Sequence, residues 1–115
     1  MSEIKIPDLD KMDKLVQEIS TISIEVARLS TELKLAQTDI IRTVTTDPAY
    51  FVRGKPPAMN FIEGTYSYTG INGELIEKRK SLAEMEAMLD AKKTLLDFYK
   101  TVIEVWRTQS ANERN

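Results

Sequence analysis

The sequence contains no cysteine and no histidine, and these absences remove the residues that most often carry chemistry. Without cysteine, neither a disulfide framework nor a thiolate site can form. Without histidine, the chain lacks the usual general base near neutral pH and the commonest metal ligand. No Gly-rich phosphate loop, nucleophile elbow or paired-acid motif is present. The one dense carboxylate group, Asp8, Asp10 and Asp13, lies at the start of a predicted helix, where acids favour the macrodipole. We therefore expect no enzymatic activity, metal or cofactor.

Long apolar runs and a large excess of one charge are also lacking. No stretch approaches the roughly eighteen apolar residues of a membrane span, and the first residues show no signal-peptide core. We therefore expect a cytoplasmic protein with no membrane partner. The 16 basic and 18 acidic residues nearly cancel, so nucleic acid would have to bind a local patch. A length of 115 residues, 42% of them hydrophobic, fits one folded domain.

A heptad seam dominates the first third of the chain. Its apolar residues alternate at spacings of three and four, at positions 12, 15, 19, 22, 26, 29, 33, 36 and 40. Pro7 and Asp8 are typical of a helix start, and the run Thr43 to Thr46 before Asp47-Pro48 is typical of a helix end. The pattern predicts a helix over about residues 8–45.

A second long helix is predicted over about residues 72–110. Asn72 is a good capping residue, Glu74 and Glu77 suit the first turn, and the polar tail SANERN is expected to fray. A seam on this helix comprises Leu75, Leu82, Met85, Leu89, Leu96, Tyr99, Ile103 and Trp106. Two helices of matching length with one connection predict a mainly α protein, a single-domain antiparallel helical hairpin.

Both predicted helices also carry apolar residues away from their seams. The first has a second line at Ile24, Ala27, Leu35 and Ile41. The second is apolar all round near its end, at Leu95, Leu96, Phe98, Tyr99, Val102, Ile103, Val105 and Trp106. A helix that is apolar on every side needs cover on every side. The N-terminal arm, with Ile4 and Ile6, could supply it, but we favour self-association into a homo-oligomer, with Leu95, Phe98, Tyr99, Val102, Ile103, Val105 and Trp106 in the interface.

The connection, residues 46–71, is longer than two helices need and rich in aromatic residues. The alternation in NFIEGTYSYTG predicts one or two short strands, which could pair as a β-hairpin, and DPAYFVRGKPP predicts turns or extended chain. Cations interleaved with rings suit single-stranded nucleic acid, because cations meet phosphates while rings stack on bases. The candidate residues are Tyr50, Phe51, Arg53 and Lys55, with Arg42 before them and Lys78, Arg79 and Lys80 after them. Alternatively, the rings only pin the connection to the helix ends and the cations are merely solvated.

The order of these features resembles the recombination mediators of T4-type phages. The resemblance spans about residues 6–108 and includes IPDLDKMDKL at the start of a long helix, DP with an aromatic and then KP, and LLDFYKTVIEVWRTQ in the second helix. It implies an oligomeric helical protein that binds single-stranded DNA and helps a RecA-like recombinase displace the single-strand binding protein. The positions that would correspond to the family's DNA-binding residues are Lys34, Arg42, Arg53 and Lys55. The stretch RTVTT before DP differs from the family's aromatic-Gly-basic segment.

Three functions remain open from the sequence. The first is a mediator-like DNA-binding accessory. The second is an assembly adaptor or scaffold that acts only through protein contacts. The third is a prefoldin-like holdase, which shares the order helix, β-hairpin, helix. Such a protein would hold its clients by exposed apolar helix tips, whereas the apolar excess here lies near the opposite end.

Overall fold

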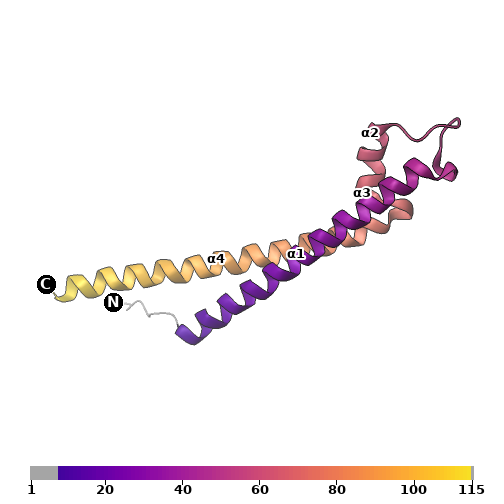
Figure 1. Cartoon of the computed structure of the whole chain (residues 1–115). Coiled ribbons are helices and arrows are strands. Elements are labelled where there is room, and N and C mark those ends of the chain that lie inside the picture. The colour runs from indigo at the N-terminus through magenta and orange to yellow at the C-terminus, as the bar shows by residue number, and fades with distance from the viewer. Residues whose placement is uncertain (1–7, 115) are drawn as a thin grey trace. The chain divides into compact units, whose positions relative to one another are not determined.

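The computed structural model describes residues 8–114, which are almost entirely helical (Figure 1). Two long helices, α1 (Leu9–Thr46) and α4 (Glu74–Arg114), confirm the prediction of a mainly α chain with two long helices. Between them lie the short elements η1 (Pro48–Tyr50), α2 (Met59–Phe61), η2 (Ile62–Tyr66), α3 (Ser67–Thr69) and η3 (Ile71–Gly73). Within the described range, neither α1 nor α4 has a stretch apolar enough to cross a bilayer.

Helix α1 begins and ends within one residue of its predicted bounds. The Asp8 carboxylate caps the helix by accepting from the Asp10 backbone N–H at 2.9 Å. At the other end, the hydroxyls of Thr43, Thr45 and Thr46 donate to carbonyls of the preceding turn, and the chain then leaves the helix before Pro48. Pro7, the other predicted start signal, lies outside the described residues.

The predicted strands in NFIEGTYSYTG are wrong, because residues 59–69 form a continuous helical run. Its middle, η2, is a π-helix, and it is flanked by the α-helical turns α2 and α3. Ile62 and Tyr66 lie four residues apart and both pack against the core of buried residues. Residues at a spacing of four share one face of a helix, so the apolar pattern of this segment is helical and not that of a strand. Among the described residues, pairing of β type is limited to one isolated bridge, Val52 with Lys55.

Both ends of α4 differ from prediction. Asn72 does not cap the helix: it has a left-handed φ of 56° inside η3, and α4 begins two residues later, at Glu74. At the far end, the residues predicted to fray are helical through Arg114. That tail has no proline or glycine, and Ala111, Glu113 and Arg114 are good helix formers.

The described chain divides into two compact units, which we treat separately. The connection unit comprises residues 25–84, and the terminal unit comprises residues 8–24 and 85–114. In each unit, a segment of α1 runs antiparallel to a segment of α4 (Figure 1). The connection unit has a core of Leu33, Ile40, Val44, Ile62 and Leu75, which joins both long helices to the connection. The buried residues of the terminal unit are Leu15, Ile22 and Leu89.

The predicted α1 seam is confirmed within each unit. All nine positions are buried or half-buried: Met12, Leu15, Ile19 and Ile22 in the terminal unit, and Val26, Leu29, Leu33, Ala36 and Ile40 in the connection unit. Of the second line, Ile24, Ala27 and Leu35 are exposed, whereas Ile41 packs against the core of the connection unit. Ile4 and Ile6, the alternative cover for the apolar surface, lie outside the described residues.

An ion pair between the two helices of the terminal unit gives a testable pH dependence. The Lys92 ammonium donates to Glu18 Oε2 at 2.7 Å, and this hydrogen bond lowers the pKa of Glu18 below its ordinary value. A lowered pKa means that the ion pair stabilises the folded state at pH values above the unfolded-state pKa of about 4.3. This stabilisation is lost as the pH falls through the folded-state pKa. Glu18→Gln should therefore have a lower urea midpoint than the wild type at about pH 7, and the two midpoints should converge at an acid pH below the folded pKa of Glu18.

Glu86→Gln is the matched control for this measurement, since Glu86 is exposed in the same unit and makes no ion pair there. Its midpoint should follow that of the wild type at both pH values. A Glu18→Gln deficit that persisted at the acid end would contradict the assignment to the carboxylate charge.

Candidate nucleic-acid interface

Three aromatic rings of the connection pack on one another. The Tyr66 ring meets the Tyr50 ring edge-to-face at a centroid distance of 6.3 Å, and it meets the Phe61 ring in the same way at 5.4 Å. Tyr50 and Tyr66 are half-buried against the core of the connection unit, while Phe61 stays exposed. The cluster therefore fixes η1 to the helical run 59–69, and it leaves the Phe61 ring exposed to solvent.

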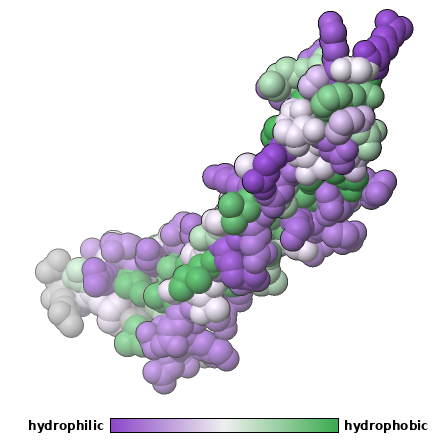
Figure 2. Space-filling model, turned by 45° about the vertical axis from the view of Figure 1, so that its right-hand side comes forward, coloured by the Kyte–Doolittle hydropathy of each residue, from purple (hydrophilic) through white to green (hydrophobic). Residues whose placement is uncertain are grey.

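The two cations predicted at the centre of the site lie on a tight turn. Val52 and Lys55 exchange two backbone hydrogen bonds, of 2.8 and 3.1 Å. The residues between them, Arg53 and Gly54, have φ angles of 54° and 75°, which is the geometry of a type I′ turn. Arg53 and Lys55 are exposed and make no ion pair within the described chain. Figure 2 shows hydrophilic side chains projecting from the end of the connection unit.

The other predicted cations have mixed surroundings. Arg42 is paired with Asp39, one turn before it on α1, and this contact neutralises part of its charge. Lys34 on α1 and Lys78 and Lys80 on α4 are exposed and make no ion pair within residues 8–114. Over residues 25–84, acidic and basic side chains are equal in number, so only local geometry can favour an anion.

Arg79 already has a structural task. Its Nε and Nη2 atoms donate to the carbonyls of Tyr68 and Ser67, each at 2.7 Å, and its guanidinium lies 4.6 Å from the centroid of the Tyr68 ring. The Ser67 carbonyl also accepts from Gln37 Nε2 at 2.8 Å. Arg79 thus satisfies carbonyls at the end of α3 and holds α3 to α4. The positive charge of Arg79 remains, but most of its hydrogen-bonding capacity is in use.

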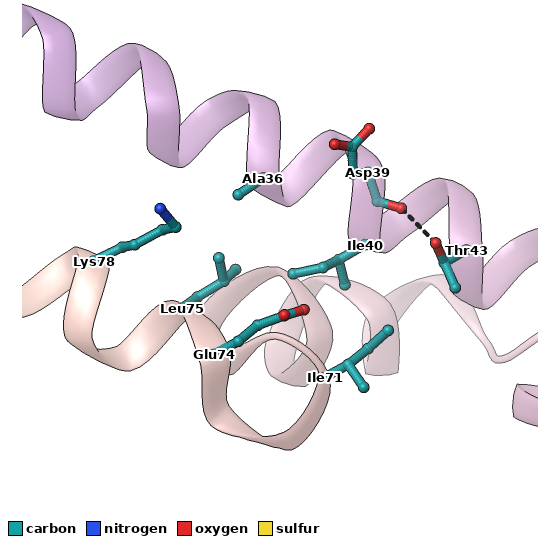
Figure 3. A pocket seen from close by; sticks show the side chains of 8 residues that line it. All are labelled: Ala36, Asp39, Ile40, Thr43, Ile71, Glu74, Leu75 and Lys78. Atoms are coloured by element: carbon teal, nitrogen blue, oxygen red, sulfur yellow. Dashed lines mark hydrogen bonds between the residues drawn. The ribbon is translucent and has the colours of Figure 1, made fainter.

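A small pocket lies beside this region, between α1 and the start of α4 (Figure 3). Its volume is about 230 Å³, and Ile40, Ile71 and Leu75 form its apolar part. Lys78 extends across it toward α1, and Thr43 donates to the Asp39 carbonyl at its edge. Sites for small molecules usually exceed about 300 Å³, so this hollow is smaller than a typical small-molecule site.

Sequence reasoning missed exposed apolar side chains in the connection. Val52 and Met59 join Phe61 and Tyr68 as exposed large hydrophobic residues. The apolar excess is therefore not confined to the end of α4, as the sequence interpretation assumed. The sequence did contain a signal for the exposure of Val52, which lies directly before a two-residue turn. The Val52–Lys55 bridge is isolated, so no neighbouring strand covers the Val52 side chain.

The predicted oligomer interface falls into two groups. Leu95, Phe98, Val105 and Trp106 are exposed, while Tyr99, Val102 and Ile103 are half-buried. The adjacent rings of Phe98 and Tyr99 have centroids 6.2 Å apart and are tilted relative to each other. The apolar surface at this end of α4 is thus partly covered and partly open.

Among residues 8–114, no group of three or more acidic residues is arranged to hold a metal ion. Comparison with protein-family models, with curated proteins and with solved structures gives no match for this chain.

Proposed function

We propose that this chain is a non-enzymatic, self-associating accessory protein that binds single-stranded DNA through its connection unit. The observation that carries the proposal is the Val52–Lys55 turn, which presents Arg53 and Lys55 without carboxylate partners. Exposed rings of Phe61 and Tyr68 lie in the same unit. Two cations and two rings match the needs of a site that grips phosphates and stacks on bases.

Binding by one chain would be weak, since two phosphate contacts supply little free energy at physiological salt. Self-association would repeat the turn, so that one strand engages several copies and the contacts add through effective concentration. The resemblance to phage recombination mediators supports the same assignment and extends it to a RecA-like recombinase and a single-strand binding protein as partners.

The test is fluorescence anisotropy of a labelled oligothymidylate titrated with wild-type protein at several salt concentrations. Replacing Arg53 and Lys55 together by glutamate should weaken binding at least about tenfold at low salt, because each change replaces attraction by repulsion. Loss of two phosphate contacts should also make the slope of log affinity against log salt shallower by about 1.4.

Lys93→Glu with Lys100→Glu is the matched control, since it makes the same change in net charge on exposed residues of the terminal unit. Its affinity should stay within about twofold of the wild type, because these two lysines are not among the phosphate-contacting residues of the proposed site. Absence of wild-type binding at low salt, or equal losses in both double variants, would remove the DNA-binding proposal.

An assembly adaptor is the second candidate, and the exposed apolar residues of α4 favour it. It predicts the same oligomer, no affinity for oligonucleotides and a defined protein partner. The exposed Val52, Met59 and Phe61 also make a holdase testable, through suppression of the aggregation of an unfolded client.

A further inference from the structure

Charge is confined to one narrow stripe along the last part of α4. Between residues 87 and 109, the charged residues other than Lys92 are Asp90, Lys93, Asp97, Lys100, Glu104 and Arg107. They alternate at spacings of three and four, so they line a single side of the helix. Lys92 is already bonded to Glu18 of α1. Apart from Lys92, the remaining circumference of this segment is uncharged.

That surface contains two heptad seams, and α1 covers one of them more fully than the other. The covered seam is Met85, Leu89, Leu96, Tyr99 and Ile103, all buried or half-buried. The other, which we name the outer seam, is Met88, Ala91, Leu95, Phe98, Val102 and Val105, again at alternating spacings of three and four. Five of these six residues are exposed, with Phe98 at 59% and Leu95 at 41%, and Val102 is half-buried. Figure 2 shows hydrophobic surface interrupting the hydrophilic surface over the terminal unit.

We propose that the outer seam is a coiled-coil interface in which α4 pairs with α4 of a second copy of this chain, antiparallel to it. This inference rests on the self-association in the proposed function and specifies its partner helix and orientation. A sustained seam with a period of 3.5 residues fits a facing helix of the same period, with each side chain seated among four of the partner.

The charge pattern selects a second copy as the occupant. One flank of the outer seam is Ala87, Thr94, Thr101 and Thr108, and the other is Lys92, Tyr99 and Trp106. The single charge in these flanks, Lys92, is neutralised by Glu18. In a twofold interface each patch meets itself, so a patch of one sign would repel its copy, whereas a neutral one does not. No row of flanking charges is present to recognise an oppositely charged partner.

Residue volumes select the antiparallel orientation. In a parallel pair, Ala91 would face Ala91 and leave a void, while Phe98 would face Phe98 and overfill its layer. In an antiparallel pair, Ala91 faces Val102, Leu95 faces Phe98 and Met88 faces Val105. These layers differ less in volume than the layers of the parallel pair, and dense packing favours the more even arrangement.

The first experiment measures mass in solution by light scattering. Leu95→Glu with Phe98→Glu should lower the mass at least twofold, because the glutamate at 95 of each copy would be buried against the glutamate at 98 of the other. The matched control is Val16→Glu with Ile24→Glu, which places the same charges on exposed apolar positions of α1 in the terminal unit and should keep the wild-type mass. Far-ultraviolet circular dichroism should show wild-type helix content in both. A folded seam variant of unchanged mass would overturn the proposal.

The second experiment determines whether the two α4 helices pair parallel or antiparallel. It uses variants in which no charge is introduced into the outer seam. Because the chain lacks cysteine, Met88→Cys and Val105→Cys each introduce a unique thiol. In the antiparallel pair, only the mixture of the two variants forms disulfide dimers. In a parallel pair, each variant alone would do so, and that result would overturn the inference.

Anisotropy with the labelled oligothymidylate separates this inference from the DNA proposal. Retained oligomerisation without oligonucleotide binding would remove the DNA proposal and leave the seam in place. An oligonucleotide-binding wild type that is monomeric would remove the seam.

Discussion

Replacing Leu75 with alanine is expected to lower the free energy of unfolding by about 2–5 kcal/mol. Leu75 is 0% exposed and sits where three segments meet: Ile40 and Val44 from α1, Ile62 from the connection, and α4 itself. Truncation removes buried methyl groups and leaves a cavity. These neighbours belong to separate helical segments, which cannot all close on the space without breaking other contacts.

The adjacent residue provides the control for Leu75→Ala. Ile76 is on the same turn of α4 but is 50% exposed, so Ile76→Ala should cost less than about 1 kcal/mol. Both variants would be unfolded in urea with helix content as the readout. If the two midpoints fell together, the core of Leu33, Ile40, Val44, Ile62 and Leu75 would not be what holds the connection unit together.

The long helices were predictable because their signals are local. The α1 seam follows from residue spacing alone, and the Asp8 cap and the DP end need only neighbouring residues. The start of α4 was less accessible to sequence reasoning. Asn72 is a good cap in isolation, yet it takes a left-handed φ because η3 must bring the chain from Gly70 into α4.

The helical run 59–69 could not be predicted from its own residues. Alternating aromatics favour a strand, and the helix forms because Ile62 and Tyr66 bury against residues of α1 and α4 that are distant in sequence. Such tertiary contacts override local propensity. The hydrogen bonds of Arg79 were equally inaccessible to sequence reasoning, since its carbonyl partners lie 11 and 12 residues away.

The turn at Arg53 and Gly54 and the apolar end of α4 were both visible in the sequence, but to different extents. A turn was predictable from local chemistry alone. On α4, the sequence showed an apolar surface on all sides but not which part faces α1. Both heptad seams have similar residues, and only the register set by contacts such as Glu18 with Lys92 separates the covered seam from the outer one.

Gly70→Ala is expected to destabilise the protein by about 3 kcal/mol or more. Gly70 has φ 78° and ψ −171°, a backbone region that is essentially restricted to glycine. An added Cβ would also lie 2.8 Å from Leu75 Cγ, 2.9 Å from Glu74 Cγ and 3.1 Å from Ile40 Cδ1. Backbone strain and the clash with a fully buried leucine act together.

Gly64→Ala makes the same chemical change where neither penalty applies. Gly64 lies in η2 without a positive φ, and no atom lies within 4 Å of the added Cβ. Alanine there should stabilise the protein by about 0.5–1 kcal/mol, because glycine loses more backbone entropy in a helical turn. Thermal unfolding should therefore move in opposite directions for the two variants. A Gly70→Ala midpoint at or above that of the wild type would show that the connection enters α4 by a different backbone path.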